Sequence, residues 1–484
     1  MRASLTRHPA YLAWALAAVL ASTNALASPS ISGGGDAEFP EYQLDPCCAL
    51  CPATRDPASY STGFLKSFRT LLAGRDGWLF RSEDDLRLQF GPDEHGLREL
   101  AQLRAALEAR GVTLVMMIQP PRGLMHRDRL SAGDRARYNA ELAQFSYVHT
   151  LQELRRVGVV VPDLERLVYK PGGDFFFRAD HHWTPEGARR TAEVVAERIR
   201  ELPAYEQVER KSFVTRPSGL FRKRGTFHKA VQRICGFGAT PQYVRSYVTE
   251  PAEESDGAAL LGESAPPSIT LVGTSNSDPA YNFAGFLSER LSADILNASI
   301  AGGGLDGSML SYLGSREFRE QPPRILIWEL QPYHNLSDAE FYRQAIALVD
   351  GGCDRRPAVL SDERPLRAGR NELLFNGGGR VMDLRGGDHL LDVRFSNPAV
   401  RELEAVVWYT NGRRDTVSLQ VTPGSNDGRF VFGLRRDGEW GDWTFLSLDV
   451  HPVTAPTHGE RIETRLCRRA PAGGALVTAK GELP

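Results

Sequence analysis

Two different hydrophobic patterns meet near Cys353. Before this residue, continuous apolar runs alternate with segments whose apolar side chains recur every three or four positions, as in amphipathic helices. After it, helical patterns give way to short segments in which apolar and polar residues alternate. The first pattern is typical of a parallel sheet covered by helices on both faces, and the second of an antiparallel β-sandwich. The chain has 484 residues, more than one hydrophobic core usually holds, so two folded domains are expected.

The first half is predicted to be an α/β domain of the doubly wound type. Its continuous apolar runs predict buried strands at Val112–Ile118, Ile269–Gly273, Ile295–Asn297 and Ile325–Trp328. A helical face made by Leu97, Leu100, Leu103 and Leu107 precedes the first run. In sheets of this type, binding and chemistry collect at the carboxyl ends of the strands.

The second half is predicted to be a jelly-roll-like β-sandwich. Alternating segments lie at Asn371–Phe375, His389–Phe395, Ala405–Tyr409, Thr416–Val421, Arg429–Leu434, Thr444–Val450 and Arg461–Leu466. Asn411-Gly412 is a strong hairpin turn between two of them. The expected organisation is a signal peptide at 1–27, an α/β domain at 28–352, a β-module at 353–470 and a flexible tail at 471–484.

The N-terminus carries Arg2 and Arg7, then the apolar run Tyr11–Leu20, then Ala25-Leu26-Ala27. The apolar run is too short for a membrane span, and the small residues fit a cleavage site for export. A retained anchor is the alternative. We therefore expect a mature protein that is exported and does not span a membrane.

The charges are nearly balanced, with 58 Lys and Arg against 60 Asp and Glu. This balance argues against nucleic acid as the main partner. All six cysteines follow the signal segment, and an oxidising compartment favours disulfides. Their clustering suggests one bridge from the Cys47–Cys51 group to Cys235 and another from Cys353 to Cys467. A redox or metal cluster at Cys47–Cys51 is the alternative, but no second cluster of this kind completes it.

The sequence Asp180-His181-His182-Trp183-Thr184-Pro185 follows an aromatic run and precedes a helical pattern. Thr184 suits an N-cap and Pro185 the first helical position. If the segment is extended, Asp180 and His182 face the same way. The carboxylate then accepts a hydrogen bond from Nδ1 and leaves Nε2 free as a base. An ordinary turn and a metal site are the alternatives, but no HExxH or CxxC partner supports a metal.

A catalytic pair needs a nucleophile, and Ser275 is the best candidate. Gly273-Thr274-Ser275-Asn276-Ser277 ends a predicted strand, ahead of a helix expected near Asn282–Leu291. Backbone N–H groups at such a helix entry can stabilise an oxyanion. Ser275, His182 and Asp180 would form a complete acyl-transfer set. A phosphate-binding or purely structural turn is the more common use of such a sequence.

Other side chains are candidates for substrate binding. Arg122, at the end of its strand, suits a carboxylate on the substrate, and Tyr281 offers a phenol close to the serine. The glycines of Ala301–Gly304 could donate backbone hydrogen bonds. In the second half, Trp408, Arg413 and Arg414 combine an aromatic surface with guanidinium groups, as an acidic polysaccharide requires. The alternatives are a surface arginine, a core tyrosine, a flexible turn, a core tryptophan and a general preference for arginine.

Several stretches, taken together and in order, resemble the AlgX family of periplasmic alginate O-acetyltransferases. They are Gly77–Phe80, Gln119–Leu124, Asp180–Pro185, Gly225–Lys229, Gly273–Ser277 and Trp408–Arg414. The resemblance covers most of the mature chain. It implies an SGNH-hydrolase-like domain joined to a carbohydrate-binding module. It also implies a Ser275–His182–Asp180 triad and disulfides Cys51–Cys235 and Cys353–Cys467. The serine follows the Asp-His pair here, whereas typical SGNH hydrolases place the serine first.

The implied activity is transfer of acetyl groups, through an acetyl-serine, to mannuronate hydroxyls of alginate. The resemblance implies an acetyl donor from upstream acetylation proteins and partners in the alginate export complex of a Gram-negative bacterium. We expect a monomer with no cofactor and no metal. A carbohydrate acetylesterase that uses water as acceptor is one alternative, and a non-catalytic polysaccharide-binding scaffold is another.

Overall fold

The protein is described from a computed structural model, which covers residues 50–237, 240–252, 266–421 and 427–470. The predicted signal peptide 1–27, Cys47, Cys48 and the tail 471–484 lie outside the described residues. No helix in the described ranges is long and apolar enough to cross a bilayer.

A four-stranded parallel sheet forms the centre of the first half, in the order β3-β8-β6-β7. Its strands are β3 (Thr113–Ile118), β6 (Ile269–Val272), β7 (Ile295–Asn297) and β8 (Ile325–Leu330). All four predicted apolar runs form these strands. Their side chains join one continuous core with the helices, which is why the runs show no polar alternation.

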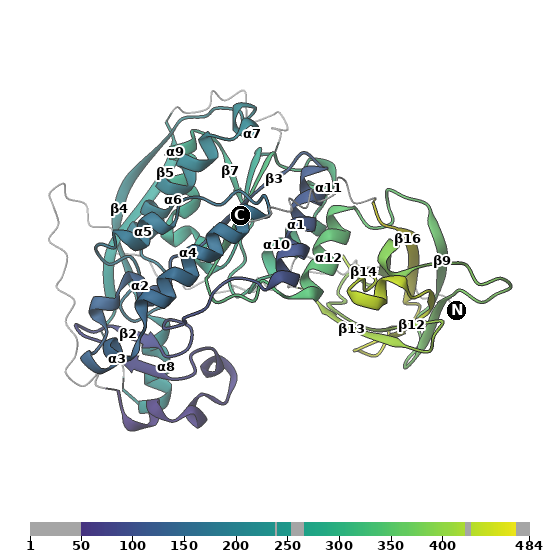
Figure 1. The fold of residues 1–484 in the computed structure, drawn as a ribbon, viewed down its shortest axis with the longest axis horizontal. Helices are drawn as coiled ribbons and strands as arrows, with labels where there is room; N and C mark the ends of the chain where they lie inside the picture. Colours follow the sequence, from purple (N-terminus) through teal and green to yellow (C-terminus); the bar gives the residue numbers. More distant parts are fainter. Residues whose placement is uncertain (1–49, 238–239, 253–265, 422–426, 471–484) are drawn as a thin grey trace, which may run out of the picture. The chain divides into compact units, whose positions relative to one another are not determined.

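Helices cover both faces of this sheet (Figure 1). One layer contains α1 (Glu94–Glu108), α10 (Gly307–Gly314), α11 (Arg316–Glu320) and α12 (Ala339–Val349). The other contains α4 (Ala140–Arg156), α5 (Glu165–Tyr169), α6 (Pro185–Arg200) and α9 (Phe283–Leu291). Shorter helices are α2 (Arg122–Met125), α3 (Ala132–Arg137) and α7 (Pro203–Glu206). The predicted α/β class is confirmed.

Two antiparallel pairs add to this half and were not predicted. The short pair is β1 (Leu71–Ala73) with β2 (Leu79–Arg81), and the long one is β4 (Phe213–Lys223) with β5 (Gln242–Pro251). The long ribbon contains Pro217 and Gly219 at a register shift, and most of its residues are exposed or half-buried. It therefore carries no clean period-two signal. Its first strand leads directly into α8 (Thr226–Cys235).

The second half contains two four-stranded antiparallel sheets that enclose a separate apolar core. One sheet has the order β14-β11-β16-β9 and the other β10-β15-β12-β13. Their strands are β9 (Ala358–Pro365), β10 (Asn371–Phe375), β11 (His389–Phe395), β12 (Glu402–Tyr409), β13 (Arg414–Gln420), β14 (Arg429–Gly433), β15 (Phe445–His451) and β16 (Arg461–Arg468). The predicted β-sandwich is confirmed, and only β9 among these strands was missed.

Two disulfides join Cys51 to Cys235 and Cys353 to Cys467. Both pairings that the resemblance implied are therefore confirmed. The bridges span 184 and 114 residues of sequence, so each restricts a large loop of the unfolded chain. The second one joins the segment before β9 to the last strand, β16.

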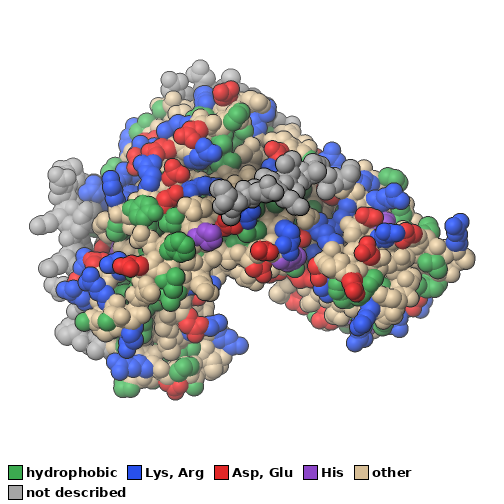
Figure 2. Space-filling model, viewed as in Figure 1, with side chains coloured by type: hydrophobic (Ala, Val, Ile, Leu, Met, Phe, Trp, Pro, Cys, Tyr) green, Lys and Arg blue, Asp and Glu red, His purple; other side chains and the backbone are tan. Residues whose placement is uncertain are grey.

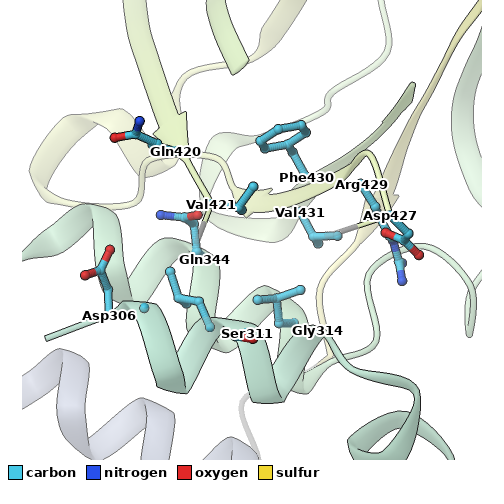
Figure 3. A pocket seen from close by; sticks show the side chains of 13 residues that line it. Asp306, Ser311, Gly314, Gln344, Gln420, Val421, Asp427, Arg429, Phe430 and Val431 are labelled. Atoms are coloured by element: carbon cyan, nitrogen blue, oxygen red, sulfur yellow. The ribbon is translucent and has the colours of Figure 1, made fainter. Parts of the chain in front are cut away.

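Helix α12 packs against strand β14. The buried guanidinium of Arg343, on α12, donates to the Gly433 carbonyl at 2.9 Å and to the Asp415 carboxylate at 2.8 Å. Residues of α10, α12 and the facing ends of β13 and β14 line a small cavity (Figure 3), whose volume is about 50 Å³. On the face of the molecule shown in Figure 2, cationic and anionic side chains are interspersed.

Candidate active site

Asp180 and His182 lie in a tight turn rather than in an extended segment. Phe176 and Trp183 form an antiparallel bridge, and the Phe177 N–H donates to the His182 carbonyl at 3.1 Å, which closes the turn. The His182 N–H donates to Asp180 Oδ1 at 2.8 Å. An aspartate that accepts from the backbone two residues later favours a turn over a strand. The predicted extended conformation is therefore wrong, although the predicted contact between the two side chains forms.

The turn is fixed on both sides. After it, the Thr184 hydroxyl accepts a hydrogen bond from the Gly187 N–H at 3.1 Å, and Pro185 is the first residue of α6, as predicted. The fully buried Trp183 donates its indole N–H to the Asn276 carbonyl at 2.8 Å, and its backbone N–H to Asn276 Oδ1 at 3.2 Å. Trp183 therefore connects the Asp-His turn to the turn that carries Ser275.

The structure brings Asp180, His182 and Ser275 into one hydrogen-bonded chain. His182 Nδ1 lies 2.5 Å from Asp180 Oδ1, and His182 Nε2 lies 2.7 Å from Ser275 Oγ. Asp180 is fully buried, His182 is nearly so and Ser275 is half-buried. A carboxylate that orients an imidazole, with the other nitrogen against a hydroxyl, can activate that hydroxyl as a nucleophile.

The second oxygen of Asp180 faces the start of α8. Asp180 Oδ2 accepts from the Thr226 N–H at 2.7 Å, and the Lys223 ammonium lies 3.6 Å away. A Cβ on Gly225 would lie 2.0 Å from the Ala179 carbonyl oxygen, so only glycine allows the helix to begin so close to the turn.

These contacts set the charge state of Asp180. Burial alone would raise the pKa of Asp180, but the charge and hydrogen bond of His182, together with His181 and Lys223, hold that pKa well below its ordinary value. The carboxylate is therefore ionised at neutral pH. Lys223 comes from β4, a strand that the sequence did not predict, and no local motif marks it.

His181 supports the site from the side. Its ring centroid lies 3.9 Å from that of His182, and its Nδ1 lies 2.9 Å from the Thr226 hydroxyl. Burial lowers the pKa of His181 well below the ordinary value. Donor atoms of Asp180, His181 and His182 lie within 4.8 Å of one another, the kind of cluster that can bind a metal. Both ring nitrogens of His182 are already hydrogen-bonded, so an ion there would break one of these bonds.

The other residues proposed for substrate binding in this half are largely buried. The Arg122 guanidinium donates to the carbonyls of Leu79 and Arg178 and lies 3.6 Å from Asp85. Burial lowers the pKa of Arg122 to about 10. Tyr281 is 3% exposed, and its ring stacks on His182 with centroids 5.3 Å apart. The observed contacts of Arg122 are therefore with the protein, and Tyr281 packs against His182 and against other residues of the domain.

The backbone N–H of Gly303 donates to the Ile300 carbonyl at 3.1 Å. The glycines of residues 301–304 were predicted to be possible backbone donors to an oxyanion, and this hydrogen bond already uses one of those donors.

In the β-module, the pairing of strands β12 and β13 determines which cationic side chain lies next to Trp408. Trp408 is paired with Arg414 across β12 and β13, and the Arg414 guanidinium lies 5.9 Å from the centre of the Trp408 ring. Arg413 lies in the hairpin turn, where its backbone N–H donates to Asn411 Oδ1 at 3.0 Å. Arg370, which the sequence analysis did not single out, lies 3.0 Å from the Asp449 carboxylate that also accepts from the Trp408 indole.

The parallel sheet and the site at its carboxyl edge, followed by a β-sandwich, define an SGNH hydrolase-like protein with an appended carbohydrate-binding module. Two family models match accordingly. Residues 71–332 match "SGNH hydrolase-like domain, acetyltransferase AlgX", and residues 352–479 match "C-terminal carbohydrate-binding module". The chain belongs to the AlgX family.

Relatives agree with this assignment. The chain is 43% identical to the alginate biosynthesis protein AlgX of Pseudomonas aeruginosa, over 90% of this chain and 91% of the relative. A solved structure of Pseudomonas aeruginosa AlgX superposes with a TM-score of 0.80 at 42% identity, over 87% of this chain and all of that one. The probable alginate O-acetylase AlgJ of the same organism is 31% identical, over 60% of this chain and 78% of its own length.

Proposed function

We propose that this protein is an O-acetyltransferase that places acetyl groups on mannuronate hydroxyls of alginate. One observation supports this proposal most directly: Ser275 Oγ lies 2.7 Å from His182 Nε2, and His182 Nδ1 lies 2.5 Å from the buried Asp180 carboxylate. Similarity to proteins named for alginate biosynthesis and for probable alginate O-acetylation supports the choice of polymer and of acyl group.

The reaction takes place in two steps. In the first, His182 Nε2 takes the proton of Ser275 as Oγ attacks the acetyl carbonyl of the donor. The donor's leaving group departs with that proton, and an acetyl ester remains on Ser275. In the second, a mannuronate hydroxyl gives its proton to His182 and attacks the ester, and Ser275 recovers a proton as it leaves. The two substrates therefore follow ping-pong kinetics.

Asp180 acts by holding the imidazole and by stabilising the imidazolium that forms in each step. Because the pKa of Asp180 is held well below its ordinary value, this carboxylate stays ionised over the pH range in which acyl transfer is useful. The rings of Tyr281 and His181 both pack against the His182 ring. These contacts restrict rotation of the imidazole.

The β-module binds the polymer through the exposed sheet face around Trp408 and Arg414. An aromatic ring can stack on a sugar, and a guanidinium can bind the carboxylate that each uronate carries. Holding a long anionic chain on the module raises the local concentration of acceptor hydroxyls at Ser275.

The two disulfides support an oxidising location such as the periplasm. In that setting, upstream acetylation proteins supply the acetyl group and export-complex proteins pass the polymer on.

The test is to incubate the full mature protein with 4-nitrophenyl acetate, with and without oligomannuronate, and to detect acetylated sugar by mass spectrometry. The proposal predicts acetylated oligomannuronate with the native protein and none with Ser275→Ala. Release of acetate with no acetylated sugar would identify an esterase. Normal polymer acetylation by Ser275→Ala in cells would identify a non-catalytic scaffold.

A further inference from the structure

Glu329 is a buried acid beneath the nucleophile. It lies near the end of β8, in the strand Ile325–Leu330, whose other five residues are apolar. Its side chain is fully buried in the middle of the parallel sheet. Acidic side chains rarely occupy such positions unless they have partners, so the partners of Glu329 indicate why it is there.

Those partners are mainly donors from the turn that carries Ser275. Glu329 Oε2 accepts from the Thr274 N–H at 2.7 Å, from the Thr274 hydroxyl at 2.9 Å and from the Ser277 hydroxyl at 3.1 Å. Thr274 and Ser277 flank the nucleophile on either side. The fourth donor, Gln119 Nε2, binds Oε1 at 2.8 Å from the end of β3. All four groups are uncharged, and all four face the carboxylate as donors.

Close packing reinforces these bonds. A Cβ on Gly273 would lie 2.6 Å from Glu329 Oε2 and 2.8 Å from Glu329 Cβ, so residue 273 has to be glycine for the carboxylate to reach the turn. The Thr274 hydroxyl, which donates to Glu329, also accepts from the Asn276 N–H at 3.2 Å. The hydrogen-bond network therefore extends from Glu329 through Thr274 to Asn276, the residue that binds Trp183.

We propose that Glu329 is the positioning residue of the nucleophile: its carboxylate holds the turn Gly273–Ser277 so that Ser275 Oγ faces His182. The proposal rests on the proposed function, because it concerns the same acyl-transfer site. The hydrogen bonds of Glu329 from the nucleophile turn come from Thr274 and Ser277, so its effect on the reaction passes through these two residues. An ionised carboxylate can accept from all four donors at once, whereas a protonated one needs one of its neighbours to turn and accept, which breaks one of these bonds.

This requirement makes the site sensitive to pH. Burial raises the pKa of Glu329 to about 7, and the hydrogen bonds from Thr274, Ser277 and Gln119 act in the opposite direction. Glu329 is therefore ionised above about pH 7 and becomes protonated as the pH falls below it. Positioning of Ser275 weakens in the same range, and kcat/KM for acetyl-ester cleavage falls with it.

The experiment compares native protein with Glu329→Gln, which has nearly the same shape and cannot ionise. With 4-nitrophenyl acetate at pH 8, we expect kcat to fall by about 10- to 100-fold with little change in KM, because a small displacement of a reacting group is costly. Near pH 7, Glu329 must lose a proton in the native enzyme before its carboxylate can hold the turn, whereas Glu329→Gln has no such group. The slope of log kcat/KM against pH in this range should therefore be about one unit smaller for Glu329→Gln than for the native enzyme.

Two milder variants keep the test decisive if Glu329→Gln folds poorly. Ser277→Ala and Gln119→Leu each remove one hydrogen bond to the carboxylate, but only Ser277 belongs to the nucleophile turn. Losing a bond to the ionised form favours protonation, so both variants should shift the fall in activity near pH 7 to higher pH. Only Ser277→Ala should also lower kcat on the pH plateau.

The outcomes separate the two proposals. An unchanged pH profile and unchanged kcat in folded Glu329→Gln would overturn the positioning role while leaving acyl transfer intact. An unshifted profile in both milder variants would overturn it as well. Absence of any Ser275-dependent turnover in the native protein would instead overturn the proposed function itself.

Discussion

The candidate active site and the proposed polymer-binding face of the β-module use charged groups in opposite ways. At the active site, Asp180 is fully buried, and each of its oxygens accepts hydrogen bonds from fixed donors. On the module, Arg370 and Glu372 form an ion pair with both side chains more than half exposed. Buried polar groups without partners are costly, whereas exposed ion pairs contribute little. The active site should therefore be intolerant of single changes, and the module should respond gradually.

The largest effect is expected at the active site, from a change of Asp180. Asp180→Asn keeps the shape of the side chain but places an amide against His182 Nδ1, which favours the wrong tautomer. We expect kcat for acetyl-ester cleavage to fall by about 10⁴-fold. Stopped-flow or steady-state absorbance assays measure this directly. A loss of less than tenfold would show that Asp180 does not orient the base.

The next largest effect is expected on the polymer affinity of the β-module. Trp408→Ala together with Arg414→Ala should weaken binding of oligomannuronate by about 10- to 100-fold, since a stacking surface and a guanidinium are both lost. Cleavage of a small acetyl ester should persist, because the triad is untouched. Isothermal titration calorimetry and the ester assay measure the two properties separately.

Arg413→Ala is the matched control for this pair. Arg413 and Arg414 are chemically identical neighbours, but only Arg414 is paired with Trp408 across the strands. Arg413→Ala should change polymer affinity by less than about threefold, as expected for an exposed charge. Equal losses for both single variants would mean that net charge, and not the sheet face around Trp408, recognises the polymer.

A smaller effect should come from Lys223, which is partly exposed but lies 3.6 Å from the fully buried Asp180 carboxylate. Lys223 helps to lower the pKa of Asp180 and donates to the Tyr281 hydroxyl at 2.5 Å. In Lys223→Met the positive charge is gone, so the pKa of Asp180 rises toward its ordinary value. The acid limb of kcat/KM should move to higher pH by about half a unit to one unit.

Lys223→Arg is the control, because it keeps the charge. A pH–rate profile that returns toward native with arginine and shifts with methionine would establish an electrostatic role. Identical profiles for Lys223→Met and the native protein would contradict it.

Much of the fold follows from local patterns, and the exceptions have physical causes. The strands Thr113–Ile118 and Ile269–Val272 are buried on both faces, so their apolar runs identify them. Strand β9 is an edge strand with mostly exposed residues, including Ser361, Glu363 and Arg364, and it therefore shows no apolar face. Its pairing with β16 depends on residues about a hundred positions away.

The candidate active site was also predictable where local sequence patterns indicate it. Asp180 and His182 are close in sequence and Ser275 follows a recognisable strand, so their types and positions indicated a common site. The sequence left a turn between Asp180 and His182 only as an alternative, because its closure depends on the bridge between Phe176 and Trp183. Glu329 did leave a signal, an acid at the end of an apolar strand, but the predicted strand stopped one residue before it.

The most direct test of the account is whether Ser275 becomes acetylated. The native protein would be exposed briefly to 4-nitrophenyl acetate, quenched in acid and digested, and its peptides analysed by tandem mass spectrometry. We expect one acetyl group on the peptide that contains Ser275, assigned to its Oγ, and its removal when oligomannuronate is added before quenching. No adduct on Ser275, or the same adduct in Ser275→Ala protein, would contradict acyl transfer through this residue.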